Sequence, residues 1–362
     1  MKILIIQQKR IGDVLTSSIL CNNLKKKYPD SIIDFMCYPN CVDVLKENPN
    51  IDNIIELSNK VRKSYPSLFQ FIFKIRQKKY NVVIDIYNKL ESNLITLFSG
   101  AKFKISYYKW YSFLFYNHNL MRFDGKKSPE YGFAIDNRLL LLKPLIKEKI
   151  TDIKPKLFLT EAEKKEAEKT LKSYGIVNGN RPLIMINILG SEEFKTYPLD
   201  KMAKIIDFVV AKTDANIIFN YIPNQKNEAL AVYNFCAEKT RKNIYFDLYC
   251  ESLRKFLALL SLCDVLIGNE GGAVNMAKAL EIPTFSLFSP SIDKETWQLF
   301  EDEKKHASIH LKDLKPDIYH QNSYQFIREN TLKYYDEYPL NELLNKLETY
   351  LMDNNIKIIS RI

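Results

Sequence analysis

The chain has 362 residues, of which 46% are hydrophobic and 27% are charged, and it carries a net charge of +10. Because a single core stops growing near ~250–300 residues, this length predicts two globular domains. The 10 glycines and 14 prolines exclude fibrous and disordered classes, and no apolar run approaches the roughly 18 residues of a membrane-spanning helix.

The first third of the chain alternates short β-rich runs with helical stretches. The expected strands are 2–8, 32–38, 53–57, 82–87 and 103–107. The expected helices are 14–28, 41–47 and 67–79, the last with Leu68, Phe71, Ile72 and Ile75 on one face. Buried strands that alternate with helices predict a parallel sheet covered on both faces.

The alternation stops between about residues 143 and 164 and resumes after a charged helix over 161–173. The expected strands are 183–189, 216–221, 243–248, 265–268 and 284–288. The expected helices are 199–212, 224–239, 253–263 and 273–280. We therefore predict an α/β protein with two doubly wound, Rossmann-like domains, 1–155 and 156–335, and a segment 336–362 whose helix packs back on the body. Ligands of such sheets bind at the carboxyl ends of the strands, so we expect the site in a cleft faced by both domains.

Several common functional motifs are missing. No G-x-G-x-x-G follows a strand and no G-x-S-x-G occurs, which argues against dehydrogenases and these hydrolases. No Asp-x-Asp occurs, so no bound metal is expected. The six cysteines lack a C-x-x-C pair and are expected to be reduced and mostly buried. The apolar start, Ile3–Ile6, is too short for a secretory signal, so we expect the protein to stay in the cytoplasm.

The first candidate residue is Asp13, which follows the first expected strand at a strand-to-helix turn. Gly12 is expected to let the backbone turn tightly. Asp13 has two interpretations: it caps a helix that begins at Val14, or it is a general base facing the cleft.

The second domain contains two further candidate loops. Gly271 and Gly272 follow a strand and open a helix, whose unpaired N–H groups and dipole suit a diphosphate, although glycine pairs are also ordinary tight turns. Glu270 beside them would repel phosphate, so we expect it to bind sugar or ribose hydroxyls. In the loop 189–198, Lys195 is either a phosphate ligand or an idle surface lysine.

Basic and aromatic residues are concentrated in the first third, above all between Lys102 and Tyr116. Such a surface suits anionic lipid or an acidic sugar. Nucleic acid is the competing partner, but no nucleic-acid motif supports it. We therefore expect peripheral, reversible contact with an anionic membrane and no nucleic-acid partner.

Four segments together resemble glycosyltransferase family nine, the ADP-heptose:lipopolysaccharide heptosyltransferases. They are the segments 10–14, 195–198, 267–284 and 287–297. The resemblance implies a GT-B architecture, inverting transfer without a metal, an acceptor in the N-terminal domain and a nucleotide sugar, ADP-heptose, in the C-terminal domain. The implied acceptor is a lipid-linked acidic saccharide such as a lipopolysaccharide core, reached peripherally from the cytoplasmic side of the inner membrane.

The resemblance also assigns roles to residues. Asp13 falls on the family's catalytic base, and Lys195 on its phosphate-binding lysine. The residues expected to bind the donor are Ser191, Thr196, Asn269, Glu270, Gly271, Gly272 and Asn275. The residues expected to bind the acceptor are Arg10, Gly12, Lys104 and Lys109. No cofactor is implied beyond the nucleotide-sugar substrate.

Two positions depart from the family pattern. Glu270-Gly271-Gly272 stands where the family usually has Asp-Thr-Gly, and Asn275 where it usually has histidine. Asparagine keeps a hydrogen-bonding group but cannot carry a proton as histidine does. Two alternatives therefore stay open: a GT-B transferase that uses another nucleotide sugar, and a catalytically silent protein that binds sugar nucleotides or glycans.

Overall fold

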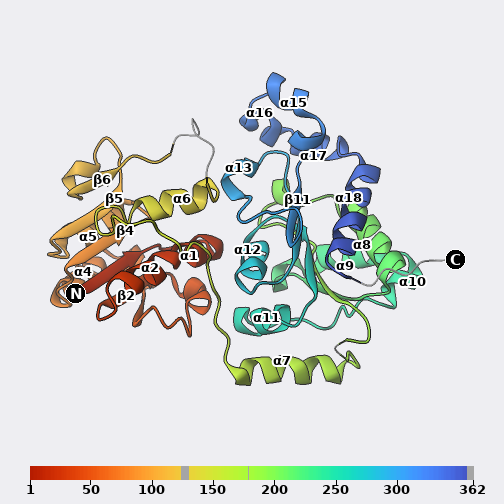
Figure 1. Ribbon diagram of the computed structural model, residues 1–362, viewed down its shortest axis with the longest axis horizontal. Helices are drawn as coiled ribbons and strands as arrows, with labels where there is room; N and C mark the ends of the chain where they lie inside the picture. The colour runs from red at the N-terminus through yellow and green to blue at the C-terminus, as the bar shows by residue number, and fades with distance from the viewer. Residues whose placement is uncertain (124–129, 178, 357–362) are drawn as a thin grey trace. The chain divides into compact units, whose positions relative to one another are not determined.

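The computed structural model describes residues 1–123, 130–177 and 179–356. The chain divides into two compact units, Met1–Phe158 with Glu295–Leu299, and Leu159–Lys294 with Phe300–Ile362. Each unit is built on one parallel sheet (Figure 1).

The first unit has a six-stranded sheet of order β3-β2-β1-β4-β5-β6. Its strands are β1 (Lys2–Ile6), β2 (Ile32–Cys37), β3 (Asn53–Glu56), β4 (Val82–Asp85), β5 (Phe103–Tyr107) and β6 (His118–Leu120). Its helices are α1 (Ile11–Ser17), α2 (Ile19–Lys27), α3 (Asn59–Lys63), α4 (Tyr65–Gln77), α5 (Leu90–Phe98) and α6 (Phe133–Leu140), with the 3₁₀ helices η1 (Pro39–Val44) and η2 (Ser112–Leu114).

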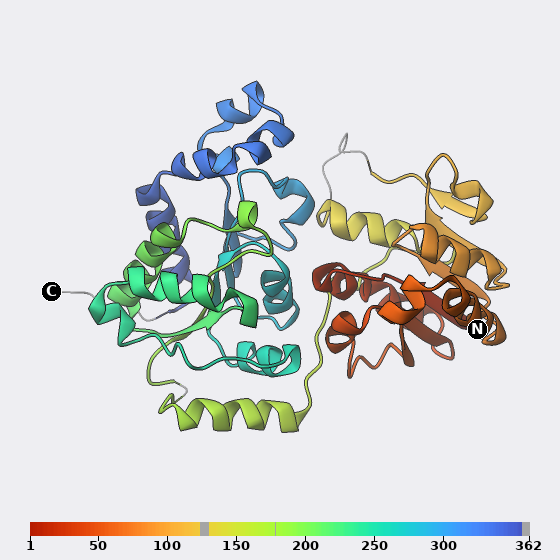
Figure 2. The ribbon, with the colours of Figure 1, turned by 180° about the vertical axis from the view of Figure 1, so that it is seen from behind.

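Helices cover both faces of this sheet, as its central, fully buried strands require. Side chains alternate between the faces, so Leu4, Ile6 and Val83 meet α4 and α5 in one apolar cluster. Helices α1, α2 and α6 pack together as a separate group. The layers can be followed from both sides in Figures 1 and 2.

The second unit has a five-stranded sheet of order β11-β10-β9-β7-β8. Its strands are β7 (Leu183–Asn187), β8 (Asn216–Asn220), β9 (Val265–Asn269), β10 (Thr284–Leu287) and β11 (His306–Ile309). Its longer helices are α7 (Glu161–Ser173), α8 (Leu199–Thr213), α9 (Lys226–Phe235), α11 (Leu253–Leu260), α12 (Gly272–Ala279) and α18 (Leu340–Asp353). Its shorter helices are α10 (Glu238–Arg241), α14 (Leu311–Leu314), α15 (Pro316–Gln321), α16 (Tyr324–Glu329), α17 (Thr331–Asp336), η3 (Glu193–Lys195) and η4 (Pro223–Gln225). The short helix α13 (Lys294–Trp297) begins at the last residue of one segment of the second unit and continues into the segment Glu295–Leu299 of the first unit.

The C-terminal helix α18 buries Leu343, Leu347 and Leu351 in the core of the second unit. The last part of the expected segment 336–362, residues 357–362, lies outside the described residues. Five of the six cysteines are buried and all six are unpaired. In the part of the chain that the structure describes, no helix is both long and apolar enough to cross a membrane.

Some expected elements are wrong in extent or kind. The expected helix 14–28 is broken at Ser18, because the hydroxyls of Thr16, Ser17 and Ser18 donate to main-chain oxygens three or four residues back and compete with helical bonding. The segment 243–248 is not a strand, since only Ile244 bridges to β8. In place of the expected helix 41–47 the structure has the 3₁₀ helix η1, which begins two residues earlier and ends at Val44. The expected helix 224–239 covers part of η4, all of α9 and part of α10.

Candidate active site

Asp13 lies in the first turn of α1, at the carboxyl end of β1. Helix α1 begins at Ile11, and its N-cap is Arg10, whose φ of 66° makes the turn. The interpretation of Asp13 as the N-cap is therefore wrong, and the sharp turn is at Arg10 instead of Gly12. As a first-turn acid, Asp13 is favoured by the helix dipole.

Asp13 forms an ion pair with Arg138, a residue of α6. The guanidinium Nη2 lies 2.8 Å from Oδ1 of Asp13, and the side chains are 8% and 22% exposed for Arg138 and Asp13. Arg138 is fixed further by donating to Ser17 Oγ at 2.9 Å and to the Ala134 carbonyl at 2.6 Å. The pair holds the carboxylate in one orientation while leaving part of it open to solvent.

Further groups lie around this ion pair, near the carboxyl ends of the strands. Burial, and then the negative charge of Asp13, raises the pKa of the Cys41 thiol to about 11. Burial raises the pKa of Tyr107 to about 12, against the positive charges of Arg138 and Arg122. The guanidinium of Arg122 stacks 4.0 Å from the centre of the Tyr107 ring. Asp13 thus lies in a cationic neighbourhood.

The other residues expected to bind the acceptor differ in exposure. Arg10 is exposed and Gly12 is half-buried in α1. The Lys104 amine donates to the Leu97 carbonyl at 2.9 Å, and burial, followed by the charge of Arg76, lowers its pKa. The Lys109 amine donates to the Asn88 carbonyl. Both amines are therefore engaged within the unit.

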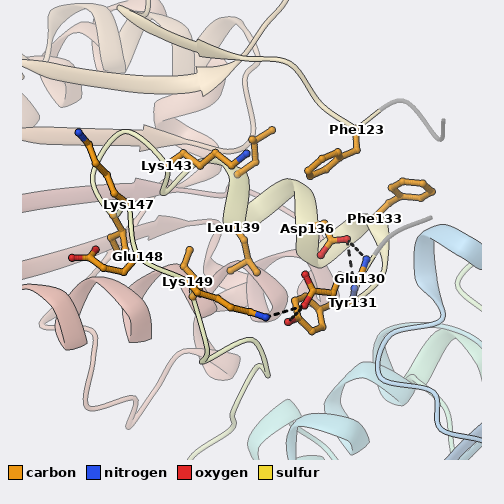
Figure 3. A pocket seen from close by; sticks show the side chains of 13 residues that line it. Phe123, Glu130, Tyr131, Phe133, Asp136, Leu139, Lys143, Lys147, Glu148 and Lys149 are labelled. Atoms are coloured by element: carbon orange, nitrogen blue, oxygen red, sulfur yellow. Dashed lines mark hydrogen bonds and ion pairs between the residues drawn. The ribbon is translucent and has the colours of Figure 1, made fainter. Parts of the chain in front are cut away.

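The first unit also has a cavity of about 390 Å³ beside α6 (Figure 3). Its charged lining residues are Lys143, Lys147, Lys149, Glu130, Asp136 and Glu148. Asp136 accepts from the N–H of Glu130 at 2.7 Å, and Lys149 lies 3.7 Å from the Glu130 carboxylate. Because its three cations are balanced by three carboxylates, the cavity does not select an anionic ligand.

Three asparagines join the carboxyl ends of the strands in the second unit. Asn220 donates to the side chain of Asn187 at 2.8 Å, and Asn187 donates to the Asn269 carbonyl at 2.7 Å. Asn269 donates to the Asn187 and Ile188 carbonyls and accepts from the N–H of Tyr197 at 2.7 Å. Its side chain is fully buried, so the structure gives it a positioning role in place of the direct donor contact that we expected.

The glycines that follow β9 differ from Gly268 within it. Gly268 has a φ of 136°, and a Cβ there would lie 2.3 Å from the Asn187 carbonyl oxygen, so only glycine fits. At Gly271 and Gly272 a Cβ would meet nothing within 4 Å. Helix α12 begins there without a side-chain cap. The space beside the α-carbons of both glycines is open, and the first N–H groups of the helix have no side-chain cap.

Two polar side chains flank the start of α12. Asn275, in the first turn, is half-buried. Burial raises the pKa of Glu270, while the positive charges of Lys195 and Lys278 oppose that rise. The N–H of Tyr197 donates to Oδ1 of Asn269 at 2.7 Å, so the loop 189–198 and the glycine turn lie close together.

The loop 189–198 is fixed by its own residues. The N–H of Gly190 donates to Thr196 Oγ1 at 3.0 Å, and Thr196 donates to the Glu192 carbonyl at 3.1 Å, so its hydroxyl is used within the loop. Ser191 is exposed. The half-buried Lys195 places its amine 5.7 Å from the centre of the Phe194 ring.

Four charged residues of these sites were missed by sequence reasoning: Arg122, Arg138, Lys278 and Arg328. Arg328, from α16, stacks 4.2 Å from the Phe194 ring centre, beside Lys195. Lys278 is buried on α12, 3.7 Å from the buried carboxylate of Glu301. Arg138 and Arg328 are distant in sequence from the residues they contact, and no local pattern marks them.

Comparisons with known proteins agree on one family. The model of "Glycosyltransferase family 9 (heptosyltransferase)" matches residues 68–325. Lipopolysaccharide heptosyltransferase 1 of Campylobacter coli is 25% identical over 299 residues, covering 80% of this chain and 84% of the relative. A solved family 9 glycosyltransferase from Veillonella parvula has a TM-score of 0.78 at 16% identity, with 97% of each chain covered. The ADP-heptose lps heptosyltransferase II structure of E. coli has a TM-score of 0.70 at 18% identity, with 97% of this chain and 99% of that chain covered.

Proposed function

This chain belongs to glycosyltransferase family 9, the heptosyltransferases, and we propose that it transfers heptose from ADP-heptose to a lipopolysaccharide core or a related glycolipid. Its fold is the GT-B architecture of two parallel-sheet domains. The donor and acceptor classes are supported by the relatives' names, which include lipopolysaccharide heptosyltransferases and an ADP-heptose-dependent enzyme.

The observation that carries the proposal is the position of the Asp13 carboxylate. It lies just after the carboxyl end of β1, 2.8 Å from the guanidinium of Arg138. In the proposed step Asp13 takes the proton of an acceptor hydroxyl, and the oxygen of that hydroxyl attacks the anomeric carbon of the donor. The bond from that carbon to the diphosphate oxygen breaks, and its electron pair leaves on ADP. Attack opposite the leaving group inverts the anomeric configuration.

The second unit is proposed to bind the donor. The N–H groups at Gly271 and Gly272 and the amine of Lys195 stabilise the negative charge that develops on the departing diphosphate. Because these groups supply the positive charge, we propose that transfer needs no metal ion. Ser191, Glu270 and Asn275 remain the proposed contacts to phosphate and sugar hydroxyls, and Arg10 the exposed candidate for the acceptor.

The direct test combines the purified chain, ADP-heptose and a de-acylated lipopolysaccharide core acceptor. We expect release of ADP, an acceptor heavier by one heptose, and an inverted anomeric centre by NMR. A retained configuration contradicts the role of Asp13, and absence of transfer contradicts the proposed substrates.

A second candidate is a transferase for another nucleotide sugar, favoured by Glu270 and Asn275 at the donor loop. Thermal-shift measurement across a panel of nucleotide sugars separates the two, since the true donor should give the largest stabilisation. A silent binding protein would be stabilised by a nucleotide sugar but release no ADP with any acceptor.

A further inference from the structure

Helix α4 of the first unit has two apolar faces, and only one of them is covered. Leu68, Ile72 and Ile75 are buried against the sheet. Tyr65, Phe69 and Phe73 recur every four residues on the other side and are 77%, 57% and 60% exposed. Residues at this spacing form one stripe along a helix. A solvent-exposed aromatic stripe of this kind marks an interaction site, whereas single exposed apolar residues do not.

The neighbouring helix α5 adds one exposed aromatic residue close to the end of this stripe. Phe98 ends α5 and is 43% exposed. The guanidinium of Arg76, on α4, donates to the Phe98 carbonyl at 3.2 Å, which places the two helix ends side by side. We name Tyr65, Phe69, Phe73 and Phe98 the α4 face.

The charged residues that α4 and its flanking segments contribute beside the α4 face are all basic. The segment 58–80 contains seven basic residues and no acidic one: Lys60, Arg62, Lys63, Lys74, Arg76, Lys78 and Lys79. Arg62 forms an ion pair with Glu91, and Lys78 forms one with Asp34. Lys60, Lys63 and Lys74 are exposed. A second copy of the chain would bring two such basic surfaces together, which like-charge repulsion disfavours.

We propose that the α4 face docks on an anionic lipid bilayer, with α4 lying in the plane of the interface. The aromatic rings would enter the boundary between headgroups and acyl chains, and the exposed lysines would meet the headgroup phosphates. This inference goes beyond the expected contact at Lys102–Tyr116, because Lys104 and Lys109 direct their amines to carbonyls of the unit.

Docking in this way suits a glycolipid acceptor, and to that extent the inference rests on the proposed function. Helix α4 begins near the carboxyl ends of the strands, since Arg62 stacks 4.1 Å from the ring centre of Tyr38, which follows β2. Asp13 follows β1 and lies at the same end of the sheet, the carboxyl ends of its strands. A lipid-linked acceptor that reaches past the start of α4 would therefore approach the end of the sheet at which Asp13 lies.

The test is co-sedimentation of the full-length chain with vesicles of phosphatidylethanolamine and phosphatidylglycerol, or of phosphatidylcholine alone. We expect the wild type to bind the anionic vesicles, and F69S/F73S to bind at least about tenfold more weakly because it loses two anchors. The matched control is F235S/F326S, which removes two phenylalanines of the second unit that are 57% and 47% exposed. It should bind like the wild type. K63Q/K74Q, or added salt, should weaken binding several-fold.

Three results would overturn the proposal: equal binding of F69S/F73S and the wild type, equal binding to neutral and anionic vesicles, or loss of binding in W110S/F113S but not in F69S/F73S. Light scattering that shows a dimer lost only in F69S/F73S, without vesicle binding by the wild type, would assign the face to a second copy. Thermal melts verify that each variant is folded. Because the assay contains no donor or acceptor, its failure is distinguishable from failure of the proposed transfer.

Discussion

The two units place different chemistry at the carboxyl ends of their strands. In the first unit the central group is a side-chain pair, Asp13 and Arg138, whose members are 125 positions apart in sequence. In the second unit it is the uncapped start of α12 with the lysine of a nearby loop. A carboxylate held by an arginine suits proton removal, whereas main-chain N–H groups and a lysine suit an anionic leaving group. In the proposed function, the first unit therefore activates the acceptor and the second unit binds the donor.

The largest expected effect concerns the first unit. Asp13→Asn should lower turnover by about 10²–10⁴-fold, because the amide keeps the shape but cannot accept the proton. Steady-state kinetics with saturating donor measures the loss. Asp30→Asn, at an exposed carboxylate in the turn before β2, is the control and should leave turnover unchanged. Full turnover of Asp13→Asn would mean that the first unit does not supply the base.

Acid should distinguish the units by stability. Burial lowers the pKa of both His306 and His310 in the second unit to about 4. The unfolded chain therefore binds more protons than the folded chain between about pH 6.5 and pH 4, so stability is present above this window and is lost as pH falls through it. Each full shift corresponds to about 3 kcal/mol.

Hydrogen exchange followed by mass spectrometry should show protection in the second unit declining between pH 6.5 and 4.5. The variant H306Q/H310Q should flatten this decline. An unchanged pH dependence in that variant would show that the acid sensitivity has another origin.

Two glycine substitutions sharpen the account of the donor site. Gly268→Ala should destabilise the protein by about 2–4 kcal/mol, because its Cβ would meet the Asn187 carbonyl oxygen at 2.3 Å. Gly271→Ala has open space and should leave the free energy of unfolding within about 1 kcal/mol, while weakening ADP binding by roughly tenfold if the diphosphate occupies that space. Urea unfolding and calorimetry measure the two effects. If Gly271→Ala bound ADP as tightly as the wild type, the diphosphate would not occupy the space beside Gly271.

A smaller loss is expected from the partner of Asp13. Arg138→Lys keeps the charge but not the forked geometry that also reaches Ser17, so turnover should fall by about 10–100-fold. Affinity for ADP should stay unchanged, because Arg138 belongs to the first unit. Kinetics and calorimetry on the same preparation separate this result from general misfolding, which would lower both quantities.

No change at all is predicted on treatment with excess chelator, if Lys195 and the start of α12 supply the charge that a cation supplies elsewhere. The measurement is turnover with and without EDTA. Activity that is lost and then restored by magnesium or manganese would contradict metal-independent transfer.

The sequence predicts the parts of these sites that lie in one continuous segment better than the parts that come from distant segments of the chain. The loop around Lys195 and the turn at Gly271 are continuous segments after strands, so spacing and family resemblance pointed to them. Arg138 and Arg328 come from helices far along the chain, and their contacts arise only from tertiary packing. Similarly, the edge strand β6 is only three residues long and has no alternating pattern, so it was missed. The sequence of α4 is apolar on two faces, and no local pattern shows that Tyr65, Phe69 and Phe73 lack a covering element.

Calorimetric titration of ADP into the wild type, Asp13→Asn and Lys195→Gln tests the division of roles most directly. The account predicts that Asp13→Asn binds ADP as tightly as the wild type, and that Lys195→Gln binds it about 10–100-fold more weakly because a charge-assisted contact to phosphate is lost. Lys226→Gln, an exposed lysine of α9, controls for loss of charge and should bind normally. Equal affinity in Lys195→Gln, or weakened affinity in Asp13→Asn, would contradict the assignment of donor binding to the second unit alone.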